Sequence, residues 1–399
     1  MSLDPDTKPV CYAFSLTPWQ DPWMNRQQLL SRLGRRGWRV VYSTGALNIW
    51  ERNTDTWRSA PLFARQHDMD GVRVDLAGRS LPVWPSRPRY SAWAIARYCA
   101  SLQRRAATAR HKDAIVYLFW PKFLPYALAV GYKHLVYHAV DSYAGMPGWN
   151  TELENLEKEA VARADLLIGT TEQALARLPP GGSAPRHVLP NGADVMAYAR
   201  GPDLPCPEDL ARIPQPRICY AGNLNRKVDF NLIAAIAHAR PVWHWVIVGP
   251  TIEGMGHPSR DPMIAEGYTA CCRLPNVHFL GCKTVAELPA YMGHADANVM
   301  CYRSDDGGWW SSGYPLKLHE YLACGMPVIS APLTAVQPFA HVVDLASSVD
   351  EWLAALERAL YHGGVGTPEQ RRAVANENTW DMRVDRIEEW LYEMLGRKS

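Results

Sequence analysis

Short apolar runs alternate with helix-length amphipathic stretches along almost the whole 399-residue chain. In the first half we expect strands at residues 10–16, 38–44, 71–76, 114–119, 134–140, 165–171 and 186–192. In the second half we expect them at residues 217–222, 243–249, 276–281, 297–302, 327–331 and 341–346. This alternation is typical of parallel sheets covered by helices. It predicts an α/β protein with doubly wound, Rossmann-like sheets.

Five prolines interrupt the alternation between Gly201 and Pro216. Because proline removes a backbone donor and stops regular elements, we expect a linker there. The chain length favours two domains. We therefore predict a first domain at 1–200, a linker at 201–216, a second domain at 217–380 and a C-terminal helix at 381–399 that packs back on the first domain. Ligands of open α/β sheets bind beyond the carboxyl ends of the strands, so we expect a cleft between two such edges.

The near-neutral total charge conceals two unlike halves. Residues 1–200 hold 25 basic and 17 acidic side chains, and the remainder holds 17 and 23. The basic half is the better candidate to meet an anionic partner. We expect an anionic membrane surface to contact a cluster close to Trp23 and Trp38, formed by Arg32, Arg35, Arg36 and Arg39. Nucleic acid is the alternative, but no recognised binding motif accompanies the charge.

The apolar stretch near the N-terminus, Val10 to Leu16, is too short for a signal-peptide core or a membrane span. No other apolar run approaches the length of a span. We expect a cytoplasmic protein, with peripheral contact to the inner face of the cell membrane as part of the membrane hypothesis.

The segment 312–330 carries the most chemistry. Pro315 suits the first position of a helix, and Gly325 suits its left-handed C-terminal cap. The N-terminus of this helix is a candidate anion site, and Lys317 adds a positive charge in a first turn where the helix dipole disfavours one. A bound diphosphate would explain that charge, and Glu320 could then accept hydrogen bonds from a ribose. A plain surface pair between Lys317 and Glu320 is the alternative.

The stretch PLKLHEYLACGMPVIS (315–330) resembles the donor-binding helix and strand of GT-B glycosyltransferases, in the group 1 (family 4-like) set. The stretches VLPNGADV (188–195) and YAGNLNRKVDFNLI (220–233) match the same family in the right order. The first half resembles more loosely the polysaccharide transferases of this set, through LVYHAVDSY (135–143) among others. The resemblance implies a GT-B fold, in which two Rossmann-like domains face a central cleft. It also implies that Glu320 binds the ribose of a nucleotide sugar.

The ends of the predicted strands, the start of the helix at Pro315 and this resemblance together supply the other site candidates. The donor side comprises Gly222, Asn223, Arg226, Lys227, Gly249, Tyr302, Arg303, Gly313, Tyr314, Pro315, Leu316, Lys317 and Glu320. The catalytic candidates are His138, Asp141 and Lys317, and the acceptor-side candidates are Trp19, Asn25 and Arg26. Plain structural roles stay open: a core histidine for His138, a helix cap for Asp141 and a solvated turn for Arg226 and Lys227. The chain departs from the family at Ser312, where relatives carry a first Glu, and at Asn223, where many carry Arg.

A metal-dependent GT-A enzyme is a competing architecture, since Asp68-Met69-Asp70 satisfies its Asp-x-Asp string. These residues precede an apolar strand instead of following one, so we interpret them as a polar turn and expect no metal site. A nucleotide diphosphate sugar then serves as co-substrate without a further cofactor.

We expect transfer of its sugar to a glycan or polyprenyl-diphosphate-linked acceptor in bacterial polysaccharide biosynthesis, and the family resemblance implies that the transfer retains the anomeric configuration. The alternatives are a nucleotide-sugar 2-epimerase of the same fold and a non-catalytic two-domain ligand-binding protein. The latter would normally carry an export signal.

Overall fold

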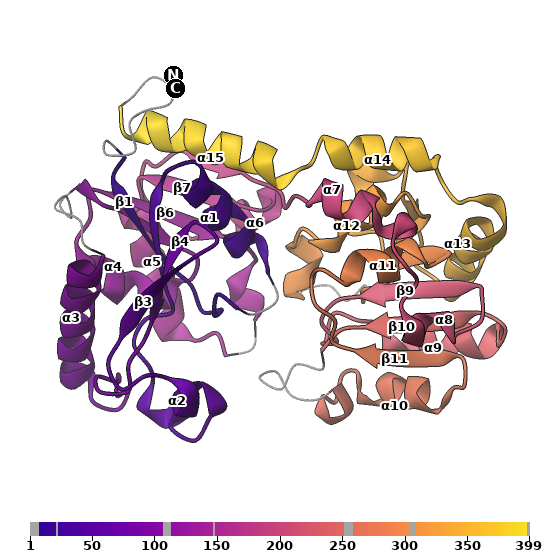
Figure 1. Cartoon of the computed structure of the whole chain (residues 1–399), viewed down its shortest axis with the longest axis horizontal. Coiled ribbons are helices and arrows are strands. Elements are labelled where there is room, and N and C mark those ends of the chain that lie inside the picture. The colour runs from indigo at the N-terminus through magenta and orange to yellow at the C-terminus, as the bar shows by residue number, and fades with distance from the viewer. Residues whose placement is uncertain are drawn as a thin grey trace. The chain divides into compact units, whose positions relative to one another are not determined.

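The computed structural model describes residues 8–20, 23–106, 113–146, 148–250, 258–303 and 308–396. The chain forms two compact units, shown with their elements in Figure 1. Unit 1 comprises residues 1–144, 148–190 and 383–399, and unit 2 comprises residues 145–147 and 191–382. The first seven residues, which precede the apolar stretch tested above for an export signal, lie outside the described residues.

Unit 1 is built on one sheet. Its strands, in spatial order, are β3 (Arg65–Met69), β4 (Val72–Leu76), β2 (Arg39–Ser43), β1 (Val10–Phe14), β5 (Ile115–Leu118), β6 (His134–Ala139), β7 (Leu166–Gly169) and β8 (Arg186–Val188). All neighbouring pairs are parallel except β3 with β4. Strands β1, β5 and β7 are buried along their whole length, as expected for strands covered on both faces.

The sequence analysis missed one strand of this sheet. Strand β3 has the polar sequence RQHDM and lies at the sheet edge, where one side of the strand needs no apolar neighbour. The predicted polar turn at Asp68-Met69-Asp70 is therefore wrong in part: Asp68 and Met69 end β3, and Asp70 forms the turn with a positive φ of 54°.

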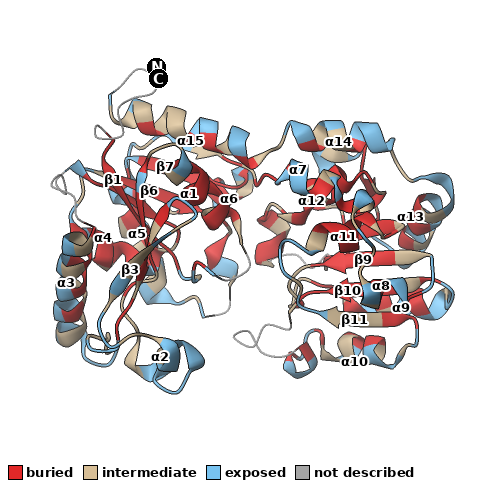
Figure 2. Cartoon of the chain, viewed as in Figure 1, coloured by how far each residue is buried: buried red, intermediate tan, exposed pale blue. Residues whose placement is uncertain are grey.

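Helices of unit 1 lie between the strands along the chain. They are α1 (Asn25–Arg35), α2 (Asp55–Ser59), α3 (Pro88–Arg105), α4 (Leu124–Val130), α5 (Thr151–Arg163) and α6 (Glu172–Ala176). Figure 2 shows buried strands and helices with one exposed face. No helix in the described ranges is both long and apolar enough to span a bilayer.

Unit 2 contains a parallel sheet of six described strands. In spatial order these are β11 (Val277–Gly281), β10 (His244–Val248), β9 (Arg217–Ala221), β12 (Ala297–Met300), β13 (Val328–Ser330) and β14 (Asp344–Leu345). The helices are α7 (Val195–Ala199), α8 (Glu208–Ala211), α9 (Phe230–Ala239), α10 (Ala265–Arg273), α11 (Leu288–Gly293), α12 (Lys317–Cys324), α13 (Val349–His362) and α14 (Pro368–Asn376). Every strand predicted in the second half contains an observed one.

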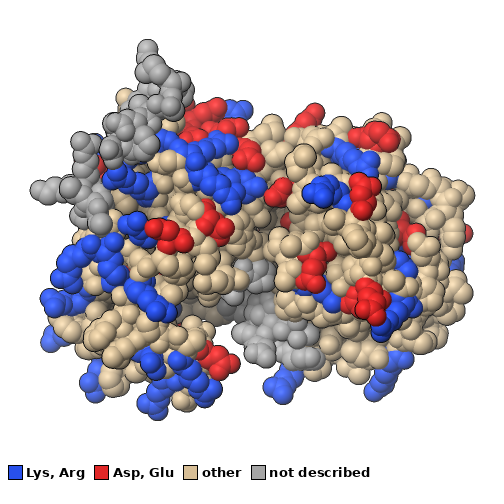
Figure 3. Space-filling model, viewed as in Figure 1, with Lys and Arg blue, Asp and Glu red and all other residues tan. Residues whose placement is uncertain are grey.

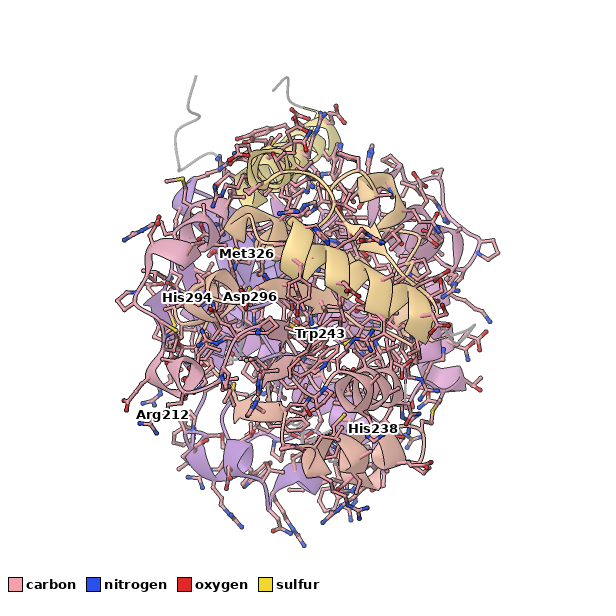
Figure 4. All side chains as sticks on the ribbon, turned by 90° about the vertical axis from the view of Figure 1, so that its right-hand side faces the viewer. Arg212, His238, Trp243, His294, Asp296 and Met326 are labelled. Atoms are coloured by element: carbon pink, nitrogen blue, oxygen red, sulfur yellow. The ribbon has the colours of Figure 1, made fainter. Side chains whose placement is uncertain are left out.

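The segment 201–216 lies within unit 2, where we expected a linker. Leu210 and Ile213 are buried in the core of the unit. His294 bonds the carbonyl of Leu204 at 2.6 Å, and Asp296 accepts from the backbone of Arg217 at 2.7 Å. Figure 4 labels His294 and Asp296 on the same side of the unit as Arg212. The prolines therefore separate short turns that pack on the unit.

Helix α15 (Trp380–Met394) begins in unit 2 and belongs to unit 1 from Arg383 onward. Its Glu388 accepts hydrogen bonds from Arg36 at 2.9 Å and from Trp38 at 2.7 Å, and Asp385 pairs with Arg36 at 2.5 Å. Arg32 is buried and bonds Gln28 at 2.6 Å. The cluster that we expected to meet an anionic membrane is therefore partly buried and partly neutralised by acids of its own chain.

Candidate active site

A buried ammonium group marks the carboxyl end of β9. Lys317, the first residue of α12, is only 6% exposed. Its Nζ lies 3.5 Å from the ring centre of Tyr220 and 5.5 Å from that of Tyr302. Among the described residues this nitrogen has no hydrogen-bond partner. Burial therefore lowers the pKa of Lys317 well below its ordinary value, and the charge of Lys227 lowers it further.

Two glycines open the space around this ammonium group. A Cβ atom on Gly222 would lie 2.6 Å from Nζ of Lys317. A Cβ atom on Gly249 would lie 2.0 Å from the carbonyl oxygen of Gly222. The φ angles of the two residues are +147° and +151°, which favour glycine. The loops after β9 and β10 can therefore approach each other closely because Gly249 lacks a side chain, and the missing side chain of Gly222 leaves room for Nζ of Lys317.

A second lysine lies beside the same aromatic ring. Nζ of Lys227 is 5.3 Å from the ring centre of Tyr302, and a β-bridge joins the neighbouring Val228 to Tyr302. Two ammonium groups thus lie near one ring, and an aromatic face compensates the charge of the buried Lys317 only in part. An isolated buried charge costs several kcal/mol, so this arrangement favours a bound anion that contacts both lysines.

Glu320 lies one turn beyond Lys317 on α12. Burial raises the pKa of Glu320 to about 7, although a hydrogen bond from Tyr198 and the charge of Lys317 act in the opposite direction. Tyr198 is buried on α7, which packs against α12. No hydrogen bond joins Lys317 to Glu320, so the alternative of a surface pair is wrong. Neither Tyr198 nor Tyr220 was among the predicted site residues: no motif marks Tyr198, and Tyr220 opens the matched stretch 220–233 but was not singled out.

The other basic candidates of unit 2 are engaged elsewhere. Nε of Arg226 donates to Asp261 at 2.5 Å. Nη1 of Arg303 donates to the carbonyl of Met263 at 2.6 Å, and Arg303 lines a separate cavity of about 510 Å³. Asn223 accepts the hydroxyl hydrogen of Tyr220 on its carbonyl oxygen at 3.1 Å. Lys227 is the basic residue of this loop whose charge acts on Lys317.

The segment before α12 differs slightly from expectation. The helix begins at Lys317, so Tyr314, Pro315 and Leu316 precede it together with Gly313. The hydroxyl of Tyr314 bonds His319 at 2.7 Å, and Nδ2 of Asn191 donates to the carbonyl of Tyr314 at 2.7 Å. Asn191 belongs to the PNG stretch of the sequence and was not among the predicted site residues. These bonds hold the approach to the helix N-terminus in place.

His138 lies near the carboxyl end of β6 in unit 1. It is 1% exposed, and its Nδ1 bonds the hydroxyl of Tyr117 at 2.9 Å. Burial lowers the pKa of His138 to about 3, and the charge of Arg26 contributes. The ring is therefore neutral at pH 7. Its Nε2 is buried and finds no hydrogen-bond partner in the part of the chain that the structure describes.

Two acceptor-side candidates share this part of unit 1. Arg26 donates through Nη1 to the hydroxyls of Ser15, at 3.1 Å, and Thr17. Oδ1 of Asn25 and Nε of Arg26 are buried without a hydrogen-bond partner in the described ranges. Asp141, just beyond β6, is partly exposed.

The third acceptor-side candidate, Trp19, is only 1% exposed, packs against Trp23 and Tyr42 and donates to Asp70 at 3.1 Å. This position differs from our expectation, because the ring fills the core of unit 1. With Asp68 paired to Arg73 at 3.0 Å, both carboxylates of the Asp-x-Asp string have partners. Among the described residues no group of three His, Cys, Asp or Glu side chains could hold a metal ion.

One family model matches the part of unit 2 that carries Lys317 and Glu320. Residues 215–361 match the model of the glycosyl transferases group 1 family. A putative teichuronic acid biosynthesis glycosyltransferase of Bacillus subtilis, TuaH, is 25% identical over 237 residues, and the match covers 57% of each chain. The chain spans little more than half the length of this relative.

Solved structures match almost the whole chain. Sucrose-phosphate synthase from Thermosynechococcus elongatus is 14% identical with a TM-score of 0.69, and the match covers 98% of this chain and 100% of that one. Anabaena Alr3699/HepE in complex with UDP and glucose is 15% identical with a TM-score of 0.68 (96% and 100% covered). The E. coli trehalose-6-phosphate protein bound with UDP-2-fluoro glucose is 15% identical with a TM-score of 0.67 (96% and 98% covered).

These likenesses show that the protein has the GT-B fold. Within this fold, residues 215–361 of unit 2 are similar to the group 1 glycosyltransferases.

Proposed function

We propose that the protein is a glycosyltransferase that takes its sugar from a nucleotide diphosphate sugar. The observation that carries this proposal is the buried ammonium group of Lys317, which has no hydrogen-bond partner in the described residues and lies near the Tyr302 ring beside Lys227. A diphosphate is an anion of suitable charge for two lysines. The UDP complexes of similar folds support UDP as the nucleotide.

The same charges would act in the chemical step. During transfer the bond between the anomeric carbon and the diphosphate oxygen breaks, and its electron pair stays on the diphosphate. Ammonium groups that are already in place stabilise this developing charge without reorganisation. The acceptor oxygen forms the new bond and loses its proton. We propose that this chemistry needs no metal ion, because Lys317 and Lys227 supply the positive charge.

Glu320 is assigned to the ribose of the donor. Its carboxylate can accept two hydroxyl hydrogens when it is ionised. With a pKa raised to about 7, the group is close to half ionised at neutral pH, so binding of a ribose would favour the ionised form. Tyr198 orients the same carboxylate by its hydrogen bond.

Unit 1 is assigned to the acceptor and to the sugar being transferred. His138 is a weak base, since its pKa is lowered to about 3, and a general base works best with a pKa near the working pH. This favours a hydrogen bond from His138 to a sugar hydroxyl over proton abstraction, which leaves Asp141 as the candidate base. Asn25 and Arg26 are the candidates to contact the acceptor. Retention of configuration is proposed from the family resemblance.

The acceptor is proposed to be a glycan or a lipid-linked glycan in polysaccharide biosynthesis. The name of the Bacillus subtilis relative supports this class. A lipid-linked acceptor would bring the enzyme to the inner face of the cell membrane.

Calorimetry with UDP, GDP and ADP and with their glucose conjugates tests the proposal. We expect one uridine ligand to bind the wild type and to lose about tenfold to about 100-fold in affinity in Glu320→Ala, since a charged hydrogen bond contributes about 1.5–3 kcal/mol. Glu287→Ala, an exposed glutamate of the same unit, is the matched control and keeps wild-type affinity. Equal affinity of wild type and Glu320→Ala for every nucleotide would overturn the donor site. A bound nucleotide sugar converted to its 2-epimer would instead identify an epimerase.

A further inference from the structure

Helix α3 presents one exposed face that is basic along its length. Its exposed charged and aromatic side chains are Arg89, Trp93, Arg97 and Arg104, spaced four, four and seven residues apart. At 100° per residue these positions lie within one quarter of the helix circumference. The inward face buries Ala94, Tyr98, Cys99 and Leu102. The stripe extends about 22 Å along the helix, and Figure 2 shows it as a pale blue face.

The positive charges of this stripe have no acidic neighbours close by in the sequence. Residues 76–112 contain no Asp or Glu. None of the three stripe arginines forms an ion pair or hydrogen bond with any residue that the structure describes. By contrast Arg105, which lies outside the stripe, pairs with the buried Asp75 at 2.7 Å. Figure 3 shows Lys and Arg side chains over the part of unit 1 where α2 and α3 lie in Figure 1, with little red among them.

Aromatic rings accompany these charges. Trp93 is 53% exposed and contacts Tyr90 at 5.6 Å between ring centres, and Tyr90 contacts Trp84 at 6.3 Å. The guanidinium of Arg87 lies 4.2 Å from the ring centre of Trp84. Tryptophan and tyrosine are enriched where proteins meet the membrane–water interface, and arginine lies there with its head group among phosphates. Alanines at 92, 96 and 100 leave the face flat between the long side chains.

We propose that the outer face of α3 binds the surface of a bilayer that contains anionic phospholipid. Charge complementarity specifies the partner: the stripe is entirely basic, and each basic residue near such a surface adds about 1 kcal/mol. A flat helix face with a half-exposed tryptophan suits a bilayer better than a nucleic acid groove. The inference rests on the proposed function in one respect: binding of α3 to the bilayer would bring unit 1 to a lipid-linked acceptor. It replaces the Arg32–Arg39 cluster as the expected membrane contact.

Sedimentation with vesicles tests this surface directly. Vesicles of phosphatidylcholine with an equal amount of phosphatidylglycerol are compared with phosphatidylcholine alone, at low and at high salt. We expect the wild type to sediment only with the anionic vesicles and to be released by salt. The triple variant R89E/R97E/R104E should bind at least about tenfold more weakly. Trp93→Ala should weaken binding without changing its salt dependence.

The control triple R163E/R212E/R386E has the same change in net charge at three exposed arginines outside α3. It should sediment like the wild type. Equal loss in both triples would show that only net charge matters and would overturn the proposal, as would a wild type that does not sediment. Binding of single-stranded nucleic acid in place of vesicles would overturn it as well. Affinity for UDP, measured in parallel, is expected to be unchanged in the α3 triple variant. The UDP measurement therefore tests the donor site, and sedimentation tests the membrane surface independently of it.

Discussion

The hydroxyl of Tyr198 donates a hydrogen bond to the carboxylate of Glu320, which joins helix α7 to helix α12. Tyr198 is 3% exposed, so its ring cannot turn away to solvent without a change in packing. The bond favours the ionised carboxylate and works against burial, which raises the pKa of Glu320 to about 7. Tyr198 is therefore a positioning residue: it holds and helps to ionise the group that we assign to the ribose.

Replacing Tyr198 with Phe should shift the pH dependence of donor binding. In the wild type, UDP affinity should fall as the pH drops through about 7, because Glu320 takes up a proton and loses an acceptor. Without the Tyr198 donor the pKa of Glu320 rises further, so the same fall should begin at a higher pH. Calorimetry between about pH 6 and about pH 9 measures both curves.

A nucleotide without ribose hydroxyls is the control for Tyr198→Phe. We expect 2′,3′-dideoxy-UDP to bind wild type and variant equally. Its affinity should not fall as Glu320 takes up a proton, because this nucleotide has no ribose hydroxyls for Glu320 to bind. If the variant weakens both nucleotides by the same factor at every pH, Tyr198 has only a structural role and the prediction is wrong.

Lys317→Met should separate stability from binding. The pKa of Lys317 is lowered, so the unfolded chain binds its proton more readily than the folded one, and stability rises as the pH increases toward the ordinary value of 10.5. Methionine removes this penalty. Without nucleotide, the variant should unfold at the same temperature as the wild type or higher near neutral pH. Its UDP affinity should fall about tenfold to about 100-fold. Thermal unfolding with and without UDP measures both effects.

Lys158→Met, at an exposed position of α5, is the matched control. It should change neither UDP affinity nor, by more than a few tenths of a kcal/mol, the stability. A Lys317→Met protein that loses stability and still binds UDP normally would contradict the donor site.

The fold was readable from the sequence where periodicity was strong. Strands β1, β5 and β9 are apolar runs bounded by turn residues, and a fully buried parallel strand needs such a run. Gly325 has the left-handed conformation expected of a helix cap, with a φ of 77°. Strand β3 escaped prediction because an edge strand can be polar on both faces.

The sequence predicted only those site residues that belong to a recognisable motif. Lys317 and Glu320 share a recognisable helix, but the tyrosines beside them, Tyr220 and Tyr198, come from other elements. The charge counts led us to expect a free cation at Arg36. Its acidic partners, Asp385 and Glu388, lie about 350 positions later in the chain. Pairings at such separation leave no local pattern.

The contact of α15 with its own unit yields the last prediction. Glu388 accepts from Arg36, from Trp38 and, at 3.5 Å, from Lys8. Burial alone would raise the pKa of Glu388, but these donors hold it below its ordinary value. The carboxylate therefore contributes stability that is present above the ordinary pKa of 4.5 and is lost as the pH falls below it. Glu388→Gln should lower the free energy of unfolding by about 1–3 kcal/mol at pH 7 and by less in acid. Thermal or urea unfolding at both pH values measures the difference, and Glu389→Gln, whose carboxylate forms a surface pair, should stay within about 0.5 kcal/mol of wild type. A loss in Glu388→Gln that is as large in acid as at pH 7 would show that packing of α15, and not the charge of Glu388, determines the stability of the contact.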